Sequence, residues 1–95
     1  MRHTTLKNVR VFAKNREGKS GFNIYLDFSG QREFLVAHRH SGLLYNLLKD
    51  GMRADDLRRW TPRRRTASCH RLEGMVSHLL AVVDDYAMER EMEYT

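Results

Sequence analysis

The sequence predicts an α+β fold in which a three-stranded antiparallel sheet (βββ) is followed by two short helices and one long C-terminal helix packed on the sheet. Three observations predict it. Apolar and polar residues alternate through residues 6–39, the spacing becomes helical over residues 41–60, and a long apolar stripe crosses residues 68–94. A chain of 95 residues has room for one hydrophobic core, so we expect residues 1–95 to form a single domain.

Residues 6–39 are predicted to form a meander of three strands, because consecutive strands with short links favour antiparallel pairing. The first strand covers residues 6–14 and places three small apolar side chains on one face: Val9, Val11 and Ala13. The second covers residues 22–28 and has the clearest alternation. Its predicted core face consists of Phe22, Ile24, Leu26 and Phe28.

The third strand is expected over residues 34–39. Strict alternation would place Phe34, Val36 and His38 on one face, opposite Leu35, Ala37 and Arg39. Glycines in the links at residues 15–21 and 29–32 indicate turns.

Residues 41–60 are predicted to form two short helices. The Ser41 hydroxyl is suited to cap the first helix, and Gly51 is suited to end it in a left-handed conformation. A second helix is expected over residues 54–60, and it should stop before Pro62 because a residue that precedes proline resists the helical region.

A basic linker at residues 61–67 leads into the long helix at residues 68–94, which Thr66 or Ser68 is placed to cap. The helix carries an apolar stripe that should pack on the sheet: Leu72, Met75, Val76, Leu79, Leu80, Val83 and Tyr86. Near its end, Met88 and Met92 stand four residues apart. They predict either a second contact, such as a homodimer through this helix, or a frayed terminus.

The charge is unevenly distributed along the chain. The chain has a net charge of +5, and residues 1–71 hold 16 of its 17 Lys and Arg residues but only 6 of its 12 Asp and Glu residues. A basic body favours an anionic partner. The alternative is self-complementarity, in which the acidic end folds back on the basic body or meets a second copy.

Composition also narrows the class of protein to which this chain can belong. Cys69 is the only cysteine, so an internal disulfide is excluded. No apolar run approaches the roughly 20 residues of a membrane span, and no apolar signal stretch follows Met1. We therefore expect a cytoplasmic protein without a membrane partner.

No chemical motif predicts catalysis, a metal or a cofactor. Gly18-Lys19-Ser20 lacks the earlier glycine and the following helix of a phosphate-binding loop. The pair His38 and His40 does not have the ligand spacing of a structural zinc site. No nucleophile and base stand together, so the chain is predicted to be non-enzymatic.

The strongest functional signal is the segment RRWTPRRR at residues 58–65. Guanidinium groups bind phosphate bidentately and an indole can stack on a base, so this composition is typical of nucleic-acid contact. The predicted binding residues are Arg58, Arg59, Trp60, Arg63, Arg64 and Arg65, with Lys7, Arg10, Lys14 and Arg39 extending the positive field. The alternative is a solvated linker in which Trp60 belongs to the core.

Residues 6–11, 21–26 and 33–36 read LKNVRV, GFNIYL and EFLV. In size and strand pattern the chain resembles the short accessory proteins of conjugative elements and phages of Gram-positive bacteria, a class that includes anti-CRISPR proteins. The resemblance implies a stoichiometric inhibitor of an RNA-guided nuclease. DNA-mimicking inhibitors are acidic whereas this chain is basic, which shifts the expected mechanism toward binding guide RNA or target DNA, or toward an acidic protein surface. The expected partner is therefore nucleic acid or a protein–nucleic-acid complex such as an RNA-guided nuclease.

Three strands followed by a helix are also similar to the arm-type DNA-binding domains of transposon integrases. That resemblance implies a sheet laid in the major groove, with Asn23, Tyr25 and Asp27 facing outward beside Arg10 and Arg39. The sequence therefore leaves three alternatives: a nuclease inhibitor, a stand-alone DNA-binding protein and a structural dimer.

Overall fold

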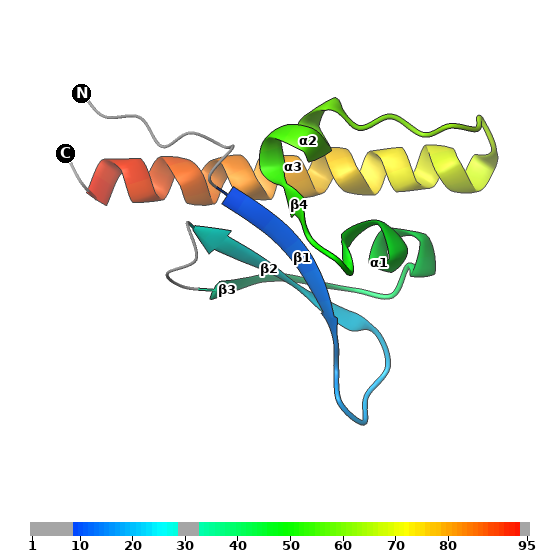
Figure 1. The fold of residues 1–95 in the computed structure, drawn as a ribbon, viewed down its shortest axis with the longest axis horizontal. Coiled ribbons are helices and arrows are strands. Elements are labelled where there is room, and N and C mark those ends of the chain that lie inside the picture. Colours follow the sequence, from blue (N-terminus) through cyan, green and yellow to red (C-terminus); the bar gives the residue numbers. More distant parts are fainter. Residues whose placement is uncertain (1–8, 29–32, 94–95) are drawn as a thin grey trace.

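The sheet has four strands. A computed structural model describes residues 9–28 and 33–93 (Figure 1). Their elements, in chain order, are β1 (Val9–Asn15), β2 (Phe22–Phe28), β3 (Glu33–Arg39), α1 (Gly42–Leu48), β4 (Met52–Arg53), α2 (Ala54–Arg59) and α3 (Ala67–Glu93). The strands are antiparallel and lie in the order β3-β2-β1-β4. The α+β class, the antiparallel sheet and the long final helix are confirmed, but the predicted count of three strands is wrong.

The missed strand, β4, is short and begins directly after a turn. Gly51 has a φ of +84°, a conformation that glycine adopts without strain. The turn brings Met52 opposite Val11 and Arg53 opposite Arg10. Two residues are too few to show a period of two, so the sequence gives no sign of this strand.

One face of the sheet, here called the inner face, forms the core with the helices. The buried strand residues are all predicted ones: Val9, Val11, Ala13, Phe22, Ile24 and Leu26. Phe28, the fourth residue of the predicted core face of β2, is only partly buried and packs against the core. The helices contribute Leu44, Leu48, Ala54, Leu57 and, from the predicted stripe of α3, Leu72, Val76, Leu79 and Val83. The contacts of α3 extend to α1 and α2 as well as the sheet, with the Tyr86 ring centroid 6.4 Å from that of Phe34.

The expected faces of β3 are wrong. Leu35 pairs with Tyr25 but Ala37 pairs with Ile24, so Val36 is an extra residue and the register shifts there. Cross-strand partners point to the same side of a sheet. Phe34, Ala37 and Arg39 therefore lie on the inner face, because their partners are Leu26, Ile24 and Phe22, whereas Leu35 and His38 lie on the opposite face.

The helix starts follow the predicted caps. The Leu44 N–H donates to Ser41 Oγ over 3.3 Å, and the Cys69 N–H donates to Thr66 Oγ1 over 3.1 Å, so Thr66 is the cap that α3 uses. At about 1.5 Å per residue, α3 is roughly as long as the 43 Å molecule, and Figure 1 shows it running along one side. Within the described ranges, no helix combines the length and the apolar character needed to cross a membrane.

Candidate nucleic-acid interface

The segment between α2 and α3 is held at both ends. The Trp60 N–H donates to the Leu57 carbonyl over 3.2 Å and ends α2, and the half-buried Trp60 side chain packs against the core. This placement supports the interpretation of Trp60 as a core residue. At the other end, Thr66 caps α3. The arginines between these two points therefore stand on a short connection with fixed ends.

Arg63, Arg64 and Arg65 are all exposed. Among the residues that the structure describes, none of the three donates a hydrogen bond or forms an ion pair. An open pocket of about 570 Å³ lies beside them, lined by Thr61, Pro62, Arg64, Arg65, Thr66, Ala67, His70 and Glu73. Three adjacent guanidinium groups are thus free to meet an external anion.

Arg58 and Arg59 differ from their neighbours because each has a carboxylate partner within the chain. Arg58 Nη2 lies 2.6 Å from Asp84 Oδ1 on α3, and Arg59 Nη2 lies 2.7 Å from Asp56 Oδ1. The ion pair between Arg58 and Asp84 brings the acidic part of the chain against the basic body, as the self-complementary alternative predicts, but it does so through one acidic residue only. The structure therefore divides the five arginines into two that are paired internally and three that are not.

The remaining predicted residues that the structure describes lie on the sheet. Arg10 and Lys14 lie on the outer face of the sheet, which is the face opposite the core. Arg39 lies on the inner side at the end of β3, opposite Phe22, and its Nη1 donates to the His38 carbonyl over 2.7 Å. The expectation that Arg39 stands beside Arg10 is therefore wrong. Lys7 lies outside the described residues.

The outer face carries an aromatic pair that the sequence analysis did not select. Phe12 and Tyr25 are direct cross-strand partners, and their rings stack with centroids 5.6 Å apart and planes 20° from parallel. Lys14 Nζ lies 5.2 Å from the Phe12 centroid and 5.5 Å from the Tyr25 centroid. The sequence does contain a signal for this pair, because the alternation of apolar and polar residues along each strand places both rings on the sheet face that is otherwise polar.

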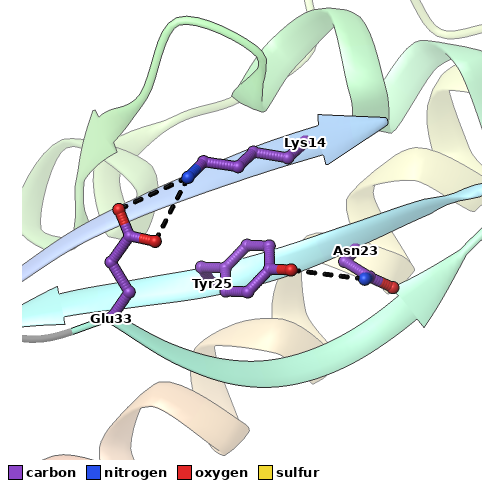
Figure 2. Close-up of polar contacts among 4 residues, drawn as sticks. All are labelled: Lys14, Asn23, Tyr25 and Glu33. Carbon is purple, nitrogen blue, oxygen red and sulfur yellow. Dashed lines mark hydrogen bonds and ion pairs between the residues drawn. The ribbon is translucent and has the colours of Figure 1, made fainter. Parts of the chain in front are cut away.

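Polar contacts join the groups around Tyr25, as Figure 2 shows. Lys14 Nζ reaches across to β3 and lies 3.2 Å and 3.4 Å from the two carboxylate oxygens of Glu33. The side-chain amide of Asn23 donates to Tyr25 Oη over 3.3 Å. Lysine and glutamate thus form an ion pair across the sheet surface, beside the two rings.

Two cations face each other at one end of the outer face. Arg10 and Arg53 are cross-strand partners, and like charges in that position repel. Arg53 contacts Asp56, whereas Arg10 donates to the Asp50 carbonyl over 3.4 Å. The Arg10 guanidinium lies directly against Gly51, where a Cβ would clash with it.

Over residues 9–28 and 33–93, no group of three or more His, Cys, Asp or Glu side chains is placed to hold a metal ion. The ring centroids of His38 and His40 lie 4.8 Å apart in an edge-to-face arrangement, and His38 Nε2 lies 3.2 Å from Arg16 Nη1.

No protein-family model, curated protein or solved structure matches this chain.

Proposed function

We propose that this chain is a non-enzymatic nucleic-acid-binding protein whose main phosphate contacts are Arg63, Arg64 and Arg65. The observation that carries the proposal is the contrast within one short stretch. Arg58 and Arg59 each contact a carboxylate of the chain, while the next three arginines are exposed and have no acidic partner among the described residues. An arginine cluster left uncompensated on a segment with fixed ends suits the repeated charge of a phosphate backbone.

The test is fluorescence anisotropy with a labelled DNA duplex of about 20 base pairs at low salt, where phosphate contacts dominate. The variant Arg63→Ala/Arg64→Ala/Arg65→Ala should bind at least tenfold more weakly than the parent. The control Lys19→Ala/Lys49→Ala removes positive charge from other exposed positions and should change affinity much less. Equal losses in the two variants would show only a net-charge effect and would contradict the proposal.

Inhibition of an RNA-guided nuclease is a narrower role within this proposal, and it rests on the resemblance to accessory proteins of mobile elements. A pull-down from lysate with and without nuclease treatment separates the two roles. Capture of a protein complex that survives the treatment favours the inhibitor. Capture that is lost with the nucleic acid favours direct binding.

The arm-type DNA-binding alternative has less support, because Arg39 does not share the outer face with Arg10. The dimer alternative is favoured by one observation, the 60% exposure of Met88 on α3. Sedimentation at several protein concentrations tests it.

A further inference from the structure

At the centre of the otherwise polar outer face, Phe12, Tyr25 and Leu35 form an apolar patch that the described part of the chain leaves partly uncovered. The six buried residues of β1 and β2 are at most 4% exposed, whereas Phe12 and Tyr25 are only half-buried and their neighbour Leu35 is 55% exposed. The buried residues of α1, α2 and α3 belong to the core on the inner face. Exposed aromatic and aliphatic groups gathered on one sheet face are typical of a binding surface.

The charges around the rings indicate what such a partner must carry. Lys14 stands beside both rings, and Arg10 at the other end of β1 lies between two cross-strand partners, Arg53 on β4 and Asp27 on β2. Asp27 beside Arg10 and Asp56 beside Arg53 already offset part of the repulsion between the two arginines, so a phosphate at Arg10 competes with Asp27, as one at Lys14 competes with Glu33. The surface therefore combines flat apolar groups with cations at either end, which suits a ligand made of planar bases and regularly spaced phosphates.

We propose that the outer face binds single-stranded nucleic acid, with bases stacked on Tyr25 and Phe12 and phosphates at Lys14 and Arg10. A duplex hides the faces of its bases, so stacking on these rings requires an unpaired strand. The proposal adds a second nucleic-acid-binding surface, which prefers single-stranded nucleic acid, to the duplex-binding surface proposed for the arginine segment.

Glu33 has a specific place in this proposal. Its carboxylate meets Lys14 Nζ through both oxygens, as a phosphate would, and the two side chains are 50% and 54% exposed. An ion pair that is open to solvent is weak and exchanges easily. Glu33 thus acts as an intramolecular competitor for the phosphate, and its removal should increase affinity.

The experiment measures anisotropy with labelled homopyrimidine DNA and RNA of about ten nucleotides, a length within the range that one small domain binds. Glu33→Gln should bind single strands roughly three- to tenfold more tightly, because the phosphate no longer competes with a carboxylate. The matched control Glu17→Gln removes the same charge from the exposed β1–β2 loop and should change affinity by less than about twofold, since it lies outside the ring pair. Equal gains in both variants, or no gain in Glu33→Gln, would overturn the proposal.

Tyr25→Leu keeps an apolar side chain but removes the stacking ring. It should weaken single-strand binding roughly tenfold, the usual effect of losing one stacked base, and leave duplex binding unchanged. Circular dichroism checks that the variant folds, and the exposed Glu33 substitution tests the proposal even if it does not. Unchanged single-strand affinity in a folded Tyr25→Leu would contradict the proposal. So would a parent protein that binds no single strand but forms a dimer that Tyr25→Leu abolishes.

The two proposals fail separately. If the arginine triple variant keeps its duplex affinity while Glu33→Gln and Tyr25→Leu shift single-strand affinity in opposite directions, the proposed role of the arginine segment is wrong and the outer-face site stands. If instead the triple variant loses duplex affinity while Glu33→Gln and Tyr25→Leu leave single-strand affinity unchanged, only the outer-face site is wrong.

Discussion

Leu79→Ala is the substitution that tests the predicted stripe of α3 most severely. Leu79 is 3% exposed and belongs to the same core cluster as Val76 and Val83. The change removes the equivalent of three methylene groups from the core, worth about 2.4 kcal/mol of transfer free energy at ~0.8 kcal/mol each. The cavity left behind raises the expected loss to roughly 3–4 kcal/mol.

The loss is large for a domain of this size, whose total stability is typically about 5–10 kcal/mol. Urea unfolding followed by far-UV circular dichroism measures it, and a thermal scan should show the melting temperature lowered by roughly 10–30 °C. Leu43→Ala is the matched control, because Leu43 is also helical but 46% exposed, and it should cost clearly less. A loss below about 0.5 kcal/mol for Leu79→Ala would show that the stripe does not face the core.

Three further outcomes are expected. Gly74→Ala should stabilise the protein by roughly 0.5–1 kcal/mol in urea unfolding, because a Cβ at this helical position meets open space; a loss of stability would contradict the helical packing described. Gly51→Ala should destabilise it by more than about 1 kcal/mol in the same assay, since a φ of +84° strains any residue that has a Cβ; a neutral result would refute the turn that positions β4. Truncation after Ala87 should leave the unfolding transition in place; if it also keeps the same mass in sedimentation and the same nucleic-acid affinity, the interpretation of Met88 as a second contact or dimer seam is wrong.

The elements with a strong local period were predictable from sequence. The bounds of β2 agree with the predicted strand because Phe22, Ile24 and Leu26 alternate with polar neighbours and all three are buried. The stripe of α3 was predictable for the same reason, since its apolar residues recur at the helical spacing over many turns. In both cases one periodic face meets one core, so a local pattern decides the structure.

Features that depend on pairing between distant segments were not predictable. The extra residue Val36 changes the faces of β3, and only the register with β2 reveals it. The partner of Arg58 is Asp84, 26 residues away on another helix, so a run of arginines cannot show which members are neutralised. The stacking of Phe12 on Tyr25 depends on the register of the β1–β2 hairpin. Exposure of Arg63 to Arg65, in contrast, follows from local charge density alone.

The central claim is that Arg63, Arg64 and Arg65 contact phosphates, and the salt dependence of duplex binding tests it most directly. Each phosphate contact contributes about 0.9 to the slope of log K against log salt concentration. Replacing all three arginines by alanine should therefore lower the slope by about 2 to 3 while the melting temperature stays nearly unchanged. A triple variant that is folded and keeps the parent slope would contradict the claim.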